Sequence, residues 1–164
     1  MPAGATYEPI ATTTLSSDSP STTFSTITGT YTDLVLIASI KGSLNDQSAL
    51  MRFNSDTGSN YSNTTLIGTG SSAVSQRQAN QTSLRIGNGN SNTNYDTYIV
   101  SINNYSNATT YKTVLSRENV SSILVSANVS LWRNTSAITS ITILLGGGDL
   151  KSGSTFTLYG IKAA

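Results

Sequence analysis

Hydrophobic and polar residues alternate along much of the chain, with the period of two that is typical of β-strands. In the longest such stretch, residues 123–131, aliphatic residues alternate with Ser and Asn. Three shorter sets each share a strand face: Ala49, Met51 and Phe53; Tyr98, Val100 and Ile102; and Tyr111, Thr113 and Leu115. Because no segment combines the helical period with capping residues, we expect about nine to eleven short strands and no helix.

Five segments carry more specific expectations. Residues 34–41 are largely apolar, which predicts a central strand covered on both faces. Residues 69–80 are polar and predict a loop, whereas residues 141–145 and 155–159 predict an antiparallel hairpin closed by a glycine-rich loop. Residues 1–20 are rich in Ser and Thr and contain proline, so they predict either an edge strand or an arm that reaches a partner.

The spacing of these strands indicates the fold class. Turn residues recur about every 8–12 positions, which favours an antiparallel sandwich or barrel over a βαβ fold. A chain of 164 residues is expected to form one domain with its own core. We therefore expect an all-β, two-sheet β-sandwich of jelly-roll type over residues 21–164, preceded by the arm or edge strand of residues 1–20.

Hydroxyl and amide side chains dominate the composition. The chain has 27 Ser, 25 Thr and 15 Asn, and only 10% of its residues are charged, against about 25% in an average domain. Thr suits strands, whereas Ser and Asn suit turns. We therefore expect these polar residues at outward-facing strand positions and in turns.

Side chains suited to catalysis are few. The chain has no histidine and no cysteine, which removes nucleophile–histidine pairs, disulfides and thiolate metal sites. A glycosidase needs two facing carboxylates, and the candidates that fold could bring together are Asp56, Asp96, Asp149 and Glu118. The prediction is that the chain is not an enzyme and has no catalytic, cofactor-binding or metal-binding residues.

One polar loop and several aromatic residues have a binding interpretation beside a structural one. Residues 54–60 are similar to a calcium loop, but the glycine comes early and only Asp56 is acidic, which favours an Asx-rich turn. Trp132 is expected to cap the core with its N–H at the rim, and the alternative is a stacking platform for a glycan. Packing between strands is likewise expected for Tyr95, Tyr98, Tyr105 and Tyr111.

Charge and hydropathy argue against two classes of partner. The net charge is +1 and the basic residues are scattered, so no nucleic-acid partner is expected. No run approaches the ~20 apolar residues of a membrane-spanning helix, so no membrane partner is expected either. Residues 1–4 lack the basic and apolar regions of a secretory signal, so none is expected.

Several stretches, taken in their order along the chain, resemble a group of structural proteins of tailed-bacteriophage virions. The stretches are YEPIA (7–11), FSTI (24–27), YTDL (31–34), RFNSDTGSNYS (52–62), NNY (103–105), YKT (111–113), WRNT (132–135), AIT (137–139) and GSTFTLYGI (153–161). Each stretch alone is ordinary turn-and-strand sequence, and the likeness rests on their collinear order over nearly the whole chain.

The resemblance implies a non-enzymatic β-sandwich displayed on the outer surface of the virion and made in the host cytoplasm. The resemblance implies first a capsid decoration (cement) protein, which binds the major capsid protein and stabilises capsomer contacts. It also implies a homo-oligomer, with a trimer favoured at local threefold sites. The alternative is a tail-fibre or receptor-binding module that recognises a host surface glycan. The resemblance carries over no catalytic residue and no cofactor.

Overall fold

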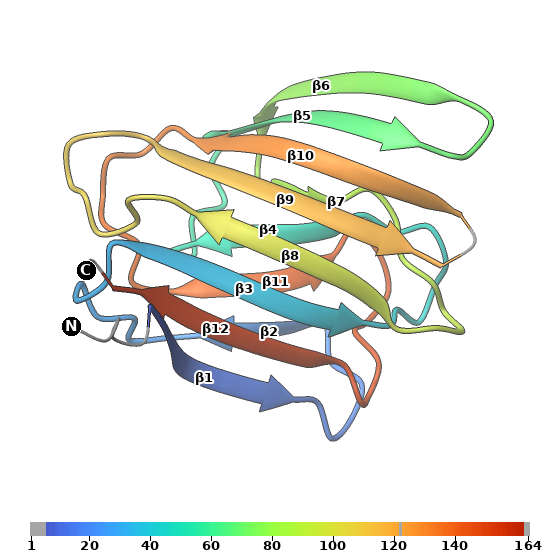
Figure 1. Ribbon diagram of the computed structural model, residues 1–164, viewed down its shortest axis with the longest axis horizontal. Coiled ribbons are helices and arrows are strands. Elements are labelled where there is room, and N and C mark those ends of the chain that lie inside the picture. The colour runs from blue at the N-terminus through green and yellow to red at the C-terminus, as the bar shows by residue number, and fades with distance from the viewer. Residues whose placement is uncertain (1–5, 122, 163–164) are drawn as a thin grey trace.

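The computed structural model describes residues 6–121 and 123–162, which fold as two antiparallel β-sheets packed face to face (Figure 1). The large sheet has eight strands, in the order β1 (Tyr7–Thr14), β12 (Thr155–Ile161), β3 (Asp33–Ile40), β8 (Asp96–Ile102), β9 (Lys112–Val120), β10 (Leu124–Trp132), β5 (Tyr61–Gly68) and β6 (Ala73–Gln81). The small sheet has four, in the order β2 (Ser21–Phe24), β11 (Ile141–Leu145), β4 (Ala49–Phe53) and β7 (Leu84–Gly87). The predicted all-β, two-sheet sandwich is confirmed, and its jelly-roll connectivity stays a prediction.

No helix among the described residues has the length and apolarity that a membrane crossing requires.

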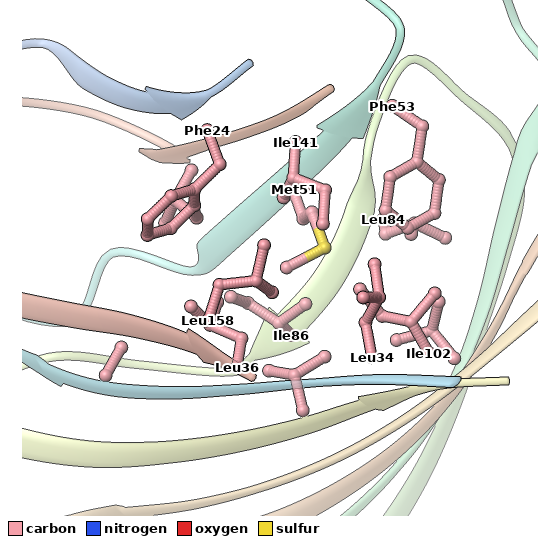
Figure 2. Close-up of a cluster of buried hydrophobic side chains, with 14 of the residues drawn as sticks. Phe24, Leu34, Leu36, Met51, Phe53, Leu84, Ile86, Ile102, Ile141 and Leu158 are labelled. Atoms are coloured by element: carbon pink, nitrogen blue, oxygen red, sulfur yellow. The ribbon is translucent and has the colours of Figure 1, made fainter. Parts of the chain in front are cut away.

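An apolar core lies between the two sheets. Figure 2 shows side chains of the small sheet, such as Met51, meeting Leu36 and Leu158 of the large sheet. The face-sharing sets predicted around Met51 in β4 and Val100 in β8 are buried as expected. Because each aliphatic side chain buried in this way contributes roughly 1.5–3 kcal/mol, this core is the main source of stability.

Of the two alternatives for residues 1–20, the structure has residues 7–14 as the edge strand β1. This strand pairs with β12 from Tyr7 opposite Ile161 to Thr14 opposite Thr155. An ion pair of 2.5 Å between Lys162 Nζ and Glu8 Oε1 joins its start to the end of β12. Residues 1–5, where an arm would begin, lie outside the described residues.

The predicted hairpin of residues 141–145 and 155–159 is wrong. The two segments are strands, but β11 lies in the small sheet between β2 and β4, and β12 lies in the large sheet between β1 and β3. The connection crosses from one sheet to the other, and on the way Leu150 exchanges backbone hydrogen bonds with Ser19. The alternation of side chains marks a strand but carries no information about its partner, and here long-range pairing decided it.

The predicted loop of residues 69–80 is also wrong, because residues 73–81 form strand β6. This strand is exposed along most of its length, and it pairs antiparallel with β5. Its side chains are mostly polar on both faces, so they show no alternation that a sequence pattern could register. Backbone hydrogen bonds to β5 hold it in the sheet.

The longest alternation in the sequence faces the opposite way from our expectation. In β10, Ser126, Asn128 and Ser130 point inward and are at most 6% exposed, whereas Val125 and Val129 are 55% and 53% exposed. The expectation that hydroxyl and amide residues occupy outward positions is therefore wrong for this strand. The reason is that the neighbouring strand β5 and strand β7 of the facing small sheet offer hydrogen-bond partners to the inward side chains.

Candidate functional site

The polar loop between β4 and β5 closes around one carboxylate. Asp56 Oδ1 accepts a hydrogen bond from the Gly58 backbone N–H at 2.8 Å, which is the predicted Asx turn. Asp56 Oδ2 accepts from Trp132 Nε1 at 2.7 Å and from Asn60 Nδ2 at 2.9 Å. Partial burial pulls the pKa of Asp56 upward, but these three donors outweigh it and lower the pKa below its usual value. The carboxylate is thus engaged in organising the loop.

Trp132 caps the core, as the structural interpretation predicted. Its ring is fully buried, and it packs edge-on against Phe53 at a centroid distance of 5.4 Å and stacks on Tyr61 at 6.3 Å. Burial also raises the pKa of Tyr61 to about 12, and the Tyr61 hydroxyl donates to the backbone carbonyl of Asp56 at 3.1 Å. Because the indole ring is enclosed, it has no free face for a sugar.

The predicted tyrosines divide into two kinds. Tyr98 and Tyr105 are fully buried and donate their hydroxyl protons to the backbone carbonyls of Gly89 and Thr28. Tyr95 and Tyr111 are 44% and 55% exposed, so packing between strands is wrong for these two.

Of the four candidate carboxylates, the structure brings Asp96 and Glu118 near each other, whereas Asp56 lies apart from them and Asp149 is exposed in the connection between β11 and β12. Asp56 lies at the Trp132 end of β10, whereas Glu118 hydrogen-bonds to Ser126 at the start of the same strand. Asp96 lies near Glu118 but accepts from the Ser121 backbone N–H at 2.9 Å. Within the described residues there is no group of three or more side chains able to hold a metal ion.

A chain of buried polar side chains lies on the inward face of β5, β10 and β9. Thr65 donates to Asn128 Oδ1 at 2.7 Å, Asn128 donates to Ser126 Oγ at 3.2 Å, and Ser126 donates to Glu118 Oε1 at 2.6 Å. We call this network the polar seam; its members are Asn63, Thr65, Arg85, Ser116, Glu118, Ser126, Asn128 and Ser130. It joins β5, β9 and β10 of the large sheet to β7 of the small sheet, where Ser130 Oγ donates to the Arg85 carbonyl.

Three atoms of the polar seam have no hydrogen-bond partner: Arg85 Nε, Ser116 Oγ and Glu118 Oε2. Burial raises the pKa of Glu118, although hydrogen bonds from Ser126 and the Asn88 backbone N–H partly offset this. Burial also lowers the pKa of Arg85, which the nearby Glu118 carboxylate partly restores. The polar seam is thus a cohesive but incompletely satisfied part of the interior.

The outer face of the large sheet carries exposed aliphatic side chains in place of the expected hydroxyls. We call the centre of this face the outer patch; it comprises Leu66, Leu115, Val125, Ala127 and Val129, with Arg117 among them. The apolar character continues onto β3, where Ile37 is 42% exposed, so the prediction that residues 34–41 are covered on both faces is wrong. Nothing within the described residues covers this face.

Cross-strand register makes the outer patch continuous. On β10, Ala127 lies opposite Arg117 of β9 and Leu66 of β5, and Val129 lies opposite Leu115. A shallow groove of about 700 Å³ runs over Leu66 and Ala127, and a second hollow of about 350 Å³ adjoins it beside Leu115. The patch is therefore one hollowed surface rather than a scatter of single aliphatic residues.

The charge on and beside the outer patch has one sign. Arg117 and Arg77 are exposed there, and the ion pairs formed by described residues, Lys151–Asp18 and Lys162–Glu8, involve neither guanidinium. In β5, β6, β9 and β10 the only acidic residue is Glu118, which points inward. The outer patch is thus apolar and cationic, with no carboxylate of its own.

The edges of the large sheet are protected against pairing. Edge strand β1 contains Pro9 and an irregular register between Pro9 and Ala11. At the other edge, β6 carries Arg77 and an irregular register near Asn80, whose φ is 55°. Proline, charge and bulges are the devices that keep an edge strand from adding another strand. The face of the sheet is therefore better suited to contact than its edges.

Sequence reasoning missed both the polar seam and the outer patch. A signal was present in the combination of strands, because the polar positions of β10 are in register with Thr65 of β5 and with Ser116 and Glu118 of β9. Three neighbouring strands that place polar residues on the same face indicate a polar interior. The pattern becomes readable only when the strand order is known.

Comparisons with known proteins give no family. No protein family and no curated protein matches the sequence. Among solved structures, an exo-inulinase from Aspergillus awamori is similar over 94% of this chain, with 10% sequence identity and a TM-score of 0.41. This chain spans 29% of the length of that enzyme. A likeness of this strength carries no argument about function.

Proposed function

We propose that this protein is a structural protein of a phage virion, a capsid decoration protein that binds the outer capsid shell and stabilises contacts between capsomers. The observation that carries the proposal is the outer patch, a hollowed aliphatic face on a strand scaffold. The collinear likeness of the sequence to virion structural proteins supports the same assignment. In this proposal the copies form a closed oligomer, a trimer, at local threefold positions of the shell.

The physical demands on a decoration protein agree with this surface. Such a protein adds many small contacts over a broad area, and standard strand spacings give four adjacent strands an outer face on the order of 400 Å². Exposed apolar patches of about 300–600 Å² on monomers often mark interaction sites. Aliphatic contact is not screened by salt, so the attachment would withstand changes of ionic strength better than one made by ion pairs alone.

The alternative of a glycan-binding tail-fibre module loses its main aromatic candidate. Trp132, the strongest stacking candidate, is enclosed in the core. A location of this protein in the tail is therefore one possible result of the test below and is not proposed as a second function.

Copy number on intact particles tests the proposal. Quantitative mass spectrometry of purified virions should find hundreds of copies of this chain per particle. A handful of copies would place it in the tail, and absence from the particle would remove the virion role altogether.

A further inference from the structure

We propose that the outer patch is the docking surface on the particle, and that its partner is an apolar area of the shell whose carboxylates pair with Arg117 and Arg77. This inference rests on the proposed function and names the face and the chemistry of the contact. The chemistry of the partner follows from the two guanidinium groups, which lose contact with solvent when a partner covers the outer patch.

Arg117 lies among aliphatic neighbours. Its cross-strand partners are Ala127 on β10 and Ile99 on β8, and Leu115 precedes it on the same face of β9. Any surface that covers the aliphatic groups must also cover this charge. A covered charge without a partner is strongly unfavourable, whereas a paired one gains from the reduced solvent screening. The covering surface must therefore bring a carboxylate to this position.

Arg77 adds a second requirement at a defined place. It lies opposite Thr64 on β5, which in turn lies opposite Val129 on β10, so three strand spacings separate it from the β9 strand of Arg117. Ordinary strand geometry puts the two guanidinium-bearing residues roughly 15 Å apart. The partner is thus an apolar surface with at least two acidic groups about that far from each other.

A second copy of this chain does not fit the same face. Two outer patches in contact would bring together four exposed arginines and no carboxylate, because Glu118 points inward. Pairing through the sheet edges is opposed by Pro9 on β1 and by Arg77 and the bulge on β6. Like charges without counter-charges disfavour this contact, so the partner is a different protein surface.

Binding of the purified protein to particles assembled without it tests the inference. Arg117→Glu and, separately, Val129→Asp should each weaken binding about tenfold or more, since one reverses the required charge and the other places a charge in the aliphatic contact. Amidation of the particle's surface carboxylates with a carbodiimide should weaken binding of the unaltered protein in the same way. Thermal unfolding of each variant checks that the fold is retained.

Matched controls carry the same chemical changes elsewhere on the molecule. Arg52→Glu reverses a charge on β4 of the small sheet, and Leu44→Asp changes a leucine that is 51% exposed in a loop. Both controls should bind within about twofold of the unaltered protein, because their positions lie outside the outer patch.

The outcomes separate the two proposals. If the unaltered protein binds in many copies and the two patch variants bind equally well, the docking face is wrong and the decoration function stands. If the unaltered protein does not bind, the decoration function is wrong and the partner named here is wrong with it. If Val129→Asp instead dissociates an oligomer in analytical ultracentrifugation, the outer patch joins copies of this chain and the inference is overturned.

Discussion

The two halves of the large sheet differ in the side chains that they turn toward the interior. On β12, β3 and β8, inward-facing residues such as Leu36, Val100 and Leu158 are apolar and fully buried against the small sheet. On β9, β10 and β5, the polar seam occupies much of the inward face beside a small buried cluster of Ile67, Val120 and Leu124, and the aliphatic residues of the outer patch face solvent. The strands of both halves alternate with the same period, so the period alone does not say which side is the interior.

The two halves of the large sheet therefore have different roles, one in the stability of the fold and the other in contact with a partner. The first half supplies the apolar core, whose burial stabilises the fold. The second half is held by hydrogen bonds within the polar seam and by the small apolar cluster around Val120, and the aliphatic groups of its outer patch are free to meet a partner. Four substitutions, taken from the largest expected effect to the smallest, test this division.

Removing core volume in the first half should have the largest effect. Leu36→Ala should lower the free energy of unfolding by about 3 kcal/mol, because it removes buried aliphatic atoms and leaves a cavity. Val129→Ala in the second half should change it by less than about 0.5 kcal/mol, because Val129 is 53% exposed. Chemical denaturation of the two variants measures both values. Similar losses would contradict the division of the sheet.

Breaking the polar seam should have the next largest effect. Asn128→Ala removes the acceptor of Thr65 and a donor to Ser126, so it should lower the free energy of unfolding by about 1–3 kcal/mol. Asn119→Ala, an exposed amide on the neighbouring strand, serves as the control and should be nearly neutral. Equal effects of the two variants in denaturant titrations would show that the seam contributes no stability.

Removing an unpaired hydroxyl should stabilise the protein. Ser116 Oγ is buried without a hydrogen-bond partner, so Ser116→Ala should raise the free energy of unfolding by about 1 kcal/mol. Ser130→Ala is the matched control and should lower it, because the one hydroxyl proton of Ser130 has two acceptors within reach, Asn63 Oδ1 at 2.9 Å and the Arg85 carbonyl at 3.0 Å. A melting temperature of Ser116→Ala below that of the unaltered protein would count against the unpaired state of this hydroxyl.

The smallest effect concerns the pH dependence of stability. Burial raises the pKa of Glu118 above its usual 4.5, so ionisation is less favourable in the folded chain than in the unfolded one. The free energy of unfolding should therefore fall as the pH rises from 4.5 through the folded-state pKa. The negative charge of Asp96 also raises the pKa of Glu118. The charged group that faces the Glu118 carboxylate from β7 is Arg85.

Glu118→Gln should remove this fall, as measured by denaturation at a series of pH values. Glu8→Gln is the opposite control, because the hydrogen bond from Lys162 lowers the pKa of Glu8 and its contribution is lost as the pH falls. If the Glu118→Gln profile follows that of the unaltered protein, the buried carboxylate does not govern this pH range.

The sequence allowed prediction where one strand could be judged alone. The buried faces of β4 and β8 and the turn around Asp56 follow from local spacing and turn chemistry. Prediction failed where the outcome depended on a neighbour: β6 is a strand only because β5 binds it, and β11 and β12 pair in different sheets. Backbone pairing is nearly independent of side-chain identity, so sequence patterns do not reveal it.

By itself, the sequence determined that this protein is built of short antiparallel strands, because period-two alternation and frequent turn residues disfavour any helix. It also determined the Asx turn around Asp56, because the Gly58 N–H that binds the carboxylate lies only two residues further along the chain. The hydrogen bond from Trp132 to the same carboxylate joins positions 76 residues apart, so it depends on the tertiary structure. Only the tertiary structure decided which face of β10 is interior. That choice depends on the side chains that surround the inward face of the strand. The flanking strands β5 and β9 and the facing strand β7 supply polar partners there, so the valines of β10 lie on the surface.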